Sequence, residues 1–476
     1  MGCFALRNLR RWDLSAALLE EREDVCTGVS RANTAIVYAG YDNKPGTLKA
    51  EMTVKANAGF NVLCQTLEVP FSRCGSLMVS FGEEADRVLL KKWEQGRQSG
   101  VPGLRLLTGE EARELEPALA PGVRSALYSP TTGTVNPWEL GIAAYENAVE
   151  NGAAVRLNTR VLSIRRDGPG YVIETDQGEF GCRAVLNCAG LTADKVQELL
   201  FPPSVRIFPT AADYLILERG TFHSPRHIIQ HEPEGREKGL TAVPTVEGSL
   251  LLGPSEREAG EPFATSREGL EQVRQLAGQV LPKLDLGGVI RSFAAVRPNP
   301  HELSFKNGEL VPSFKSINSF VIEHPGPGFW SLIGIKTPGL TCADQLGKYL
   351  ADQAAEYLNA GKNGDFRENR KAIERARGLR FQERQALVEA DADYGEILCH
   401  CEDITKAEII EAIRRGAVTV DGVKRRTGAT MGYCQGSRCQ QKIVELLARE
   451  LGIPESAVQK DGPGTRILGG RIDETM

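Results

Sequence analysis

Four cysteines near the C-terminus have the number and spacing of metal ligands. Cys399 and Cys401 form a C-x-C pair, and Cys434 and Cys439 form a C-x4-C pair further along the chain. A structural zinc site usually has about two to four residues between the cysteines of a pair, so the first pair is tight for zinc. Iron–sulfur clusters are also held by four thiolates. The spacing predicts a metal centre with four thiolate ligands, and it leaves zinc or four free cysteines as alternatives.

Two short helices are expected to bring the cysteine pairs together. Thr405 and Glu408 have the spacing of a capping box, which predicts a helix that runs to Gly416. Cys439 opens a second helical stretch that ends at Gly452. We expect the N-terminus of that second helix to favour the thiolate of Cys439.

A nucleotide site is predicted near the N-terminus. The apolar run 15–19 is typical of a buried parallel strand, and Glu20 stands at its C-terminal end, where a carboxylate can accept both hydroxyls of a ribose. Residues 5–12 before it have helical composition, and Gly2 has the place of the third glycine in a G-x-G-x-x-G loop. The pattern predicts bound dinucleotide, and the alternative is an ordinary helix and strand with a surface Glu.

Two later segments are also typical of nucleotide-binding folds. An apolar strand over residues 184–187 ends in Cys188-Ala-Gly190, where small side chains let the backbone approach a ligand. A Gly-rich segment over 334–341 enters a helix predicted over 343–360, and N–H groups at a helix start can hold anionic oxygens. A plain strand-to-helix turn is the alternative at the first of these segments.

Arg297 is the candidate for binding an anionic substrate. It lies in Ala294-Ala-Val-Arg-Pro298, which is predicted to be the end of a strand. A guanidinium can hold a carboxylate or a phosphate through two parallel hydrogen bonds. The alternative is an ordinary surface arginine.

The run from Glu20 to Asp42, EEREDVCTGVSRANTAIVYAGYD, resembles the FAD-binding opening of the D-amino-acid-oxidase-like flavoproteins. The resemblance is to the branch that includes anaerobic glycerol-3-phosphate dehydrogenases and L-2-hydroxyglutarate dehydrogenases, and Tyr38 stands where that branch usually has a histidine. It implies that Arg297 faces the flavin and binds the acidic group of the substrate. The residues that it assigns to FAD are Gly2, Glu20, Ser30, Asn33, Thr34, Val161, Ala189, Gly190, Gly334, Gly339, Leu340 and Thr341.

The same comparison leads us to expect an incomplete N-terminus. A strand and two glycines would precede Gly2 in the resembled family, as though this chain began inside the first helix. The FAD pyrophosphate would then lose several backbone N–H groups. We therefore expect weak or substoichiometric FAD binding, with the adenosine and the ring still held by Glu20, Val161 and residues 334–341.

The cysteine region resembles the bacterioferritin-associated-ferredoxin-like [2Fe-2S] module over about fifty residues, with all four ligand positions filled by Cys399, Cys401, Cys434 and Cys439. The resemblance implies a [2Fe-2S] cluster as the second cofactor. A cluster with four thiolates is anionic. We expect the basic run Lys424, Arg425 and Arg426 to offset that charge.

The composition is that of an ordinary globular protein. The chain has 476 residues, 41 % of them hydrophobic and 25 % charged, with 57 basic and 62 acidic residues and a net charge of −5. This balance gives no indication of nucleic-acid binding. The sequence has neither an apolar run of about 20 residues for a membrane span nor an apolar signal core, so we expect a cytoplasmic location.

The fold class expected is α/β plus α+β. Residues 1–360 form the oxidoreductase part, with FAD-binding segments at about 1–59, 134–199 and 316–360, and substrate segments at about 60–133 and 200–315. The FAD part is Rossmann-like and discontinuous, and the substrate part is an antiparallel sheet. A linker over 361–393, a small helical [2Fe-2S] domain over 394–453 and a tail over 454–476 follow.

A flavin and an iron–sulfur centre on one chain imply that a substrate is oxidised and that single electrons leave. The main hypothesis is an FAD-dependent dehydrogenase for a small anionic alcohol, either glycerol 3-phosphate or a 2-hydroxy acid. Its partner would be an electron-acceptor protein or a quinone-linked subunit. One alternative is an amine or amino-acid dehydrogenase of the opine type. The other is a non-catalytic iron–sulfur electron-transfer protein.

Overall fold

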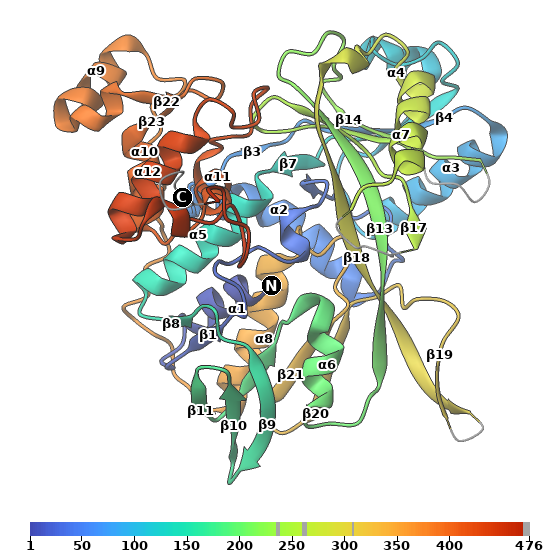
Figure 1. The fold of residues 1–476 in the computed structure, drawn as a ribbon. Helices are drawn as coiled ribbons and strands as arrows, with labels where there is room; N and C mark the ends of the chain where they lie inside the picture. The colour runs from blue at the N-terminus through green and yellow to red at the C-terminus, as the bar shows by residue number, and fades with distance from the viewer. Residues whose placement is uncertain (235–238, 259–263, 307–308, 470–476) are drawn as a thin grey trace.

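The computed structural model describes residues 1–234, 239–258, 264–306 and 309–469. Figure 1 shows three regions: a lower part around α1 and α8, a right-hand part built on the long strands β13 and β18, and a C-terminal module in orange and red. We call these the nucleotide part, the sheet part and the cysteine module. The predicted tail lies partly outside the described residues, from 470 onward, as do 235–238, 259–263 and 307–308 of the predicted substrate segments.

The nucleotide part contains two sets of parallel strands. β1 (Ala17–Leu19) pairs with β8 (Ala154–Arg156), and β12 (Val185–Asn187) pairs with β21 (Phe329–Ile333), which carries the antiparallel β20 (Val321–Gly326). Within the described ranges β1 and β12 belong to separate sheets. The first strand therefore forms as predicted, two residues shorter at its start.

Helix α1 (Gly2–Leu9) fills the space between these sheets and two helices, α5 (Pro137–Glu150) and α8 (Ala343–Tyr357). A Cβ atom on Gly2 would lie 3.4 Å from Leu18 Cδ1 and 3.7 Å from Cys188 Cβ, so the helix start is close to both sheets. At the other side, the α carbon of Gly347 lies against the backbone of Phe4. The close approach of α1 to α8 depends on the missing side chain at Gly347.

Smaller elements complete the nucleotide part. They are α2 (Leu48–Thr66), α6 (Ala193–Glu198), the sheet β2 (Ile36–Val37), β7 (Gly133–Val135) and β3 (Phe71–Ser72), and the meander β9 (Val161–Asp167), β10 (Gly170–Thr175) and β11 (Gly178–Cys182).

The sheet part is one ten-stranded, mostly antiparallel sheet in the order β19-β18-β13-β16-β15-β14-β4-β6-β5, with β17 paired to β13. Its strands are β4 (Ser76–Ser80), β5 (Arg105–Thr108), β6 (Ser125–Ser129), β13 (Val205–Leu217), β14 (Ile228–His231), β15 (Thr241–Pro244), β16 (Leu250–Gly253), β17 (Arg257–Glu258), β18 (Val289–Lys306) and β19 (Glu309–Pro312). The predicted antiparallel sheet is confirmed. β4 joins it in parallel with β14.

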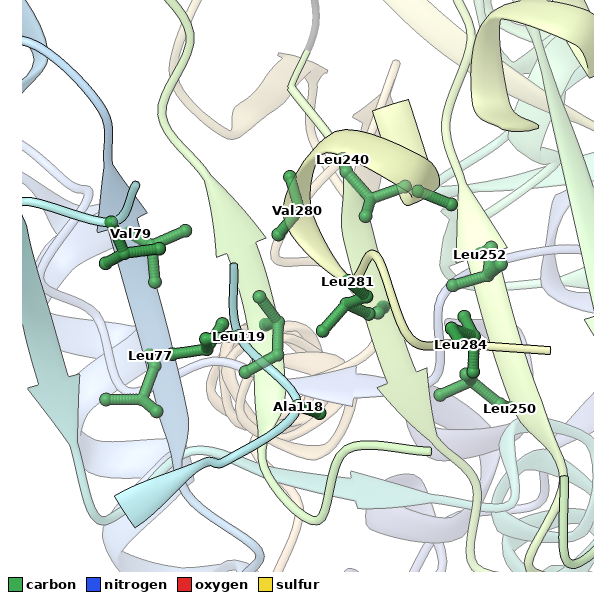
Figure 2. Packing of buried hydrophobic residues seen from close by; sticks show 14 of the residues in the cluster. Leu77, Val79, Ala118, Leu119, Leu240, Leu250, Leu252, Val280, Leu281 and Leu284 are labelled. Carbon is green, nitrogen blue, oxygen red and sulfur yellow. The ribbon is translucent and has the colours of Figure 1, made fainter. Parts of the chain in front are cut away.

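Leucines and valines on one face of this sheet form its core. Leu77 and Val79 on β4 and Leu252 on β16 are fully buried, and they pack in one cluster with Val280 and Leu281 (Figure 2). Helix α7 (Arg267–Val280) covers this face of the sheet. The helices α3 (Glu83–Gln98) and α4 (Gly109–Leu115) lie at the far edge.

The cysteine module contains β22 (Ile397–Cys399), β23 (Ile404–Thr405), α10 (Lys406–Arg414), α11 (Val420–Thr427) and α12 (Gln440–Leu451). The two predicted helices correspond to α10 and α12, and the predicted capping box of Thr405 and Glu408 is present. Helix α11 packs against α5 of the nucleotide part. The module is therefore docked on the rest of the chain.

The segment expected to be a linker has structure of its own. It contains α9 (Phe381–Ala390), which projects from the module in Figure 1. Arg370, only 3 % exposed, donates to Glu146 Oε2 at 2.7 Å and to the carbonyl of Leu67 at 3.1 Å. The arginine of this segment thus pairs with buried groups of the nucleotide part, and the assignment of 361–393 as a linker stays a prediction. No helix in the described ranges has the length and apolar content needed to cross a bilayer.

The contact at Gly347 gives the first prediction. A methyl group there would lie 2.6 Å from the carbonyl carbon of Phe4, and backbone cannot move aside cheaply. Gly347→Ala should lower the free energy of unfolding by about 1–3 kcal/mol, measured by denaturant titration. The control is Gly59→Ala in α2, where a Cβ meets nothing within 4 Å and the helix should gain about 0.5–1 kcal/mol. Equal effects of the two substitutions would contradict the packing argument.

Candidate active site

A cavity of about 1830 Å³ occupies the nucleotide part between α1, the ends of β1 and β12, and the sheet part. Its wall brings together residues from across the sequence, and it includes most of those that the sequence assigned to FAD: Gly2, Glu20, Ser30, Asn33, Thr34, Val161, Ala189, Gly190, Gly339 and Leu340. Arg297 lies on the same wall. Segments from distant parts of the sequence line the cavity, and its volume is large enough for a dinucleotide.

Glu20 lies at the C-terminal end of β1, where the sequence placed it. One carboxylate oxygen accepts the backbone N–H of Arg22 at 3.0 Å, and burial raises the pKa of the carboxyl above its usual value. At the nearby start of α1, Met1 makes no side-chain capping bond. The first N–H groups of a helix lack partners within the helix, so this end can face a phosphate.

The loop that follows β1 is held in one shape by its own side chains. Asn33 accepts the N–H of Ala35 at 2.7 Å and donates to the carbonyl of Ser30 at 2.9 Å. The indole of Trp138 donates to the carbonyl of Arg31 at 2.9 Å. Residues 30–34 therefore present a preformed wall to the cavity.

Gly334 and Thr341 lie behind the cavity wall. Gly334 has φ +62°, and a Cβ atom there would come within 2.7 Å of Pro300. Thr341, 1 % exposed, accepts the N–H of Tyr38 at 3.0 Å and donates to the carbonyl of Ile36 at 3.4 Å. Both residues support the segment that lines the cavity, and any direct contact of theirs with FAD stays a prediction.

A second cavity of about 230 Å³ adjoins the first, and Tyr38, Arg297 and Lys336 lie on the walls of both. Lys49 also lines it. Arg297 reaches it from the middle of β18, opposite Thr210. The expected position at a strand end was wrong, because β18 continues through Pro298 to Lys306 as an unusually long paired strand.

Lys49 is one of two lysines of this cavity that were not predicted from the sequence. It lies in the first turn of α2, is 9 % exposed, and donates to Asn318 Oδ1 at 3.0 Å. Burial lowers the pKa of its ammonium, the charge of Arg297 acts in the same direction, and Asp42 opposes both. A lysine in a first helical turn is unfavourable for the helix dipole, which was a usable signal for function.

Lys336, also missed, comes from the Gly-rich segment. Its ammonium donates to Ser316 Oγ at 2.9 Å and lies 3.5 Å from Asn299 Oδ1. Asp42, the acidic residue of this cavity, lies 3.1 Å from Lys92. Three cations and one partly neutralised carboxylate thus surround the small cavity, which makes it suited to an anion.

The four predicted metal ligands come together as two contacting pairs. Cys399 and Cys439 are each 1 % exposed, and Cys401 and Cys434 are partly exposed. A hydrogen bond from Cys439 lowers the pKa of Cys399 to about 6 and raises that of Cys439. Cys439 stands at the N-cap of α12, as expected, and the favouring of its thiolate by that helix stays a prediction.

The pairing bears on which metal fits. Within the described residues, no three of His, Cys, Asp and Glu are arranged around a single ion. Contacts link Cys399 to Cys439 and Cys401 to Cys434. A two-iron cluster takes two protein ligands on each iron, whereas zinc needs all four around one point. The residues present fit a [2Fe-2S] cluster.

The basic run beside the cysteines has a role that was not expected. Arg425 and Arg426, 5 % and 4 % exposed, pair with Asp24 of the nucleotide part, and Lys424 lies 3.6 Å from Asp421. Arg425 and Arg426 thus neutralise the buried carboxylate of Asp24, and Lys424 pairs with a partly exposed one. That they also offset the charge of the cluster stays a prediction, and their pairing with Asp24 was not foreseen because that carboxylate lies on a surface distant in the sequence.

Comparisons with known proteins agree with this geometry. The family model described as FAD dependent oxidoreductase matches residues 1–353, and the model of the BFD-like [2Fe-2S] binding domain matches 397–449. The chain is 38 % identical over 475 residues to the glycerol 3-phosphate dehydrogenase of Caloramator mitchellensis, covering 99 % of this chain and 96 % of that protein. It is 32 % identical over 275 residues to human mitochondrial L-2-hydroxyglutarate dehydrogenase, covering 54 % and 59 %.

Solved structures show the same fold. L-α-glycerophosphate oxidase from Mycoplasma pneumoniae with FAD bound has a TM-score of 0.69 at 20 % identity, covering 77 % of this chain and 95 % of that one. Glycerol-3-phosphate dehydrogenase from Bacillus halodurans complexed with FAD has a TM-score of 0.65 at 17 % identity, covering 95 % and 89 %. The predicted fold class and both cofactors, FAD and a [2Fe-2S] cluster, are confirmed. The expectation of an incomplete N-terminus finds no support in the comparisons, and neither does the weak FAD binding that was derived from it.

The cysteine module gives the second prediction. Protein purified without oxygen should contain two iron ions and two acid-labile sulfides per chain, measured by metal and sulfide analysis. Cys399→Ser should remove most of both, because it deletes a buried ligand. Cys64→Ser, a buried cysteine of the nucleotide part, should leave both unchanged. One zinc per chain without iron or sulfide would contradict the assignment.

Proposed function

This chain belongs to the FAD dependent oxidoreductase family, and from that premise we propose that it oxidises glycerol 3-phosphate. It is an FAD-dependent dehydrogenase with an iron–sulfur component. FAD, when bound, accepts a hydride from a C–H bond, and a [2Fe-2S] cluster accepts single electrons. The substrate and the acceptor of the electrons are the proposed parts of this function.

The observation that carries the proposal is the cationic small cavity. Arg297, Lys49 and Lys336 line it together, and it opens on the large cavity where the FAD segments meet. A phosphate monoester carries up to two charges near neutral pH and has three acceptor oxygens. Three cationic donors match that group in number and charge.

Burial adds to the match. Lys49 is nearly inaccessible, so its charge is poorly solvated, and its ammonium donates a hydrogen bond to Asn318 Oδ1. A buried ammonium is costly without an anionic partner. A bound phosphate would pair with the buried ammonium of Lys49. Removing this unfavourable unpaired charge would contribute to the affinity of the site for an anion. The relative from Caloramator mitchellensis, named for glycerol 3-phosphate, supports the same substrate.

The junction of the two cavities is the place suited to the reacting carbon of the substrate. Tyr38 lies there, and burial raises the pKa of its phenol. Its hydroxyl is bonded to Thr34 and lies near the charge of Arg297. The phenol therefore stays protonated and can donate a hydrogen bond to a substrate oxygen.

A 2-hydroxy acid is the second candidate, favoured by the similarity to L-2-hydroxyglutarate dehydrogenase. A carboxylate needs one bidentate arginine, which Arg297 could provide. The electron acceptor is proposed to be a separate protein or a quinone-linked subunit. The cytoplasmic location stays a prediction from the sequence.

Anaerobic bleaching of the flavin absorbance tests the substrate directly. Purified protein is mixed with glycerol 3-phosphate, L-2-hydroxyglutarate, glycerol and glycine in separate experiments. We expect rapid bleaching with glycerol 3-phosphate and little with glycerol, which lacks the anion. Bleaching by the amino acid instead would move the enzyme to the amine-oxidising class, and bleaching by the hydroxy acid alone would favour the second candidate.

Arg297 gives the third prediction. Loss of a charge-assisted clamp costs about 2 kcal/mol, so Arg297→Ala should raise the KM for glycerol 3-phosphate roughly thirtyfold, with a smaller effect on a neutral polyol. Steady-state kinetics measure both. The control is Arg165→Ala, an exposed strand arginine that pairs with Glu179. Equal losses with the anionic and neutral substrates would show that Arg297 is structural.

Lys49 gives the fourth prediction, which separates phosphate from carboxylate. Lys49→Met keeps the buried length of the side chain and removes its charge. The KM for glycerol 3-phosphate should rise roughly tenfold, and competitive inhibition by inorganic phosphate should weaken by a similar factor. Lys55→Met on the exposed face of the same helix is the matched control. Unchanged phosphate inhibition in Lys49→Met would place the anion elsewhere.

A further inference from the structure

Asp24 is a buried carboxylate in the loop that follows Glu20. It is 1 % exposed. Arg426 donates to both of its oxygens, at 2.7 and 2.9 Å, and Arg425 donates to one of them at 3.2 Å. The carboxylate belongs to the nucleotide part and both guanidiniums belong to the cysteine module.

A second ion pair joins the same loop to the same module. Arg31 lies 3.0 Å from Asp461, which also accepts from Arg425 at 3.0 Å. Arg31 is flanked by Ser30 and is two residues from Asn33, both on the wall of the large cavity. The loop that borders the proposed adenosine site is therefore held by the cysteine module near its beginning and near its end.

Arg425 and Arg426 lie shortly before the loop that carries the ligands Cys434 and Cys439. They stand in the last turn of α11, which ends at Gly428 with φ +85°. Two residues later, the backbone N–H of Thr430 is hydrogen-bonded to the thiols of Cys399 and Cys439. A displacement of α11 would thus move the cysteine ligands and the Asp24 contact together.

Because the contact between Asp24 and the two arginines is buried, it is sensitive to any loosening of the cysteine module. Charged groups removed from water need complete pairing, and the loss of one partner from a buried pair is strongly destabilising. If the module loosened, Asp24 and Arg426 would each have to reach water, which opens the loop. The interface therefore favours two arrangements, docked and undocked, over a continuous range.

We propose that Asp24, Arg425 and Arg426 are positioning residues that couple FAD binding to the ordered, cluster-containing state of the cysteine module. Filling either cofactor site stabilises the docked arrangement, so each cofactor raises the affinity for the other by the same factor. The proposal rests on the placement of the adenosine beside Glu20. It does not depend on the identity of the substrate.

The first test removes the contact by Asp24→Asn in the full chain. The dissociation constant of FAD, measured by titrating flavin-depleted protein that keeps its cluster, should rise about tenfold or more. Hydrogen exchange over residues 20–34 should become faster. The matched control is Asp403→Asn. Asp403 also accepts two hydrogen bonds from one arginine, Arg384, but both residues belong to the C-terminal region. Asp403 has φ +52°, which asparagine adopts readily.

The second test needs no interface variant, so it stands even if Asp24→Asn folds poorly. Iron release from the wild-type protein to a chelator is timed with and without saturating FAD, and FAD affinity is measured in Cys401→Ser/Cys434→Ser, which lacks the partly exposed ligands. We expect slower iron release with FAD, and weaker FAD binding with faster exchange over 20–34 in the cluster-free variant. Unchanged FAD affinity and exchange in the cluster-free variant would overturn the coupling.

A third variant separates this proposal from the placement on which it rests. Glu20→Gln should weaken FAD binding and leave iron retention in flavin-free protein as in the wild type. If Glu20→Gln leaves FAD affinity unchanged, the adenosine lies elsewhere. If it weakens FAD binding and FAD still has no effect on iron release, the placement holds and the coupling fails.

Discussion

The buried carboxylate of Asp24 is the constraint on which the arrangement of the chain depends. A charge that is 1 % exposed has to be met by donors from the protein, and Arg425 and Arg426 of the cysteine module provide them. This requirement holds α11 against the nucleotide part, where it packs on α5. The two cofactor-binding regions are therefore one structural unit, although they match two separate family models.

The sequence predicted the residues whose chemistry is local. Glu20 follows β1 because an apolar run ends there, and the capping box of Thr405 and Glu408 opens α10 as expected. The four cysteines converge because each pair is fixed by short spacing and by a neighbouring helix. Such patterns depend on a few residues and need no knowledge of the tertiary fold.

The cationic small cavity could not be predicted in the same way. Lys49 comes from the start of α2, Arg297 from the middle of β18 and Lys336 from the segment before α8. Their meeting depends on how the sheet part packs on the nucleotide part, and single-residue patterns carry no such information. The pairing of Arg425 and Arg426 with Asp24 was not predicted for the same reason, since this partner lies 401 and 402 residues away in the sequence.

That separation has a consequence for synthesis on the ribosome. Asp24 and α1 are synthesised long before α8 and the arginines of α11. At about 5–20 residues per second, the 402 residues between Asp24 and Arg426 take roughly 20–80 seconds to translate. Until α8 has been made, the face of α1 that packs against it, with Phe4 and Ala5, lacks its final cover. The native contacts of this segment with α8 and α11 can therefore form only when translation is well advanced.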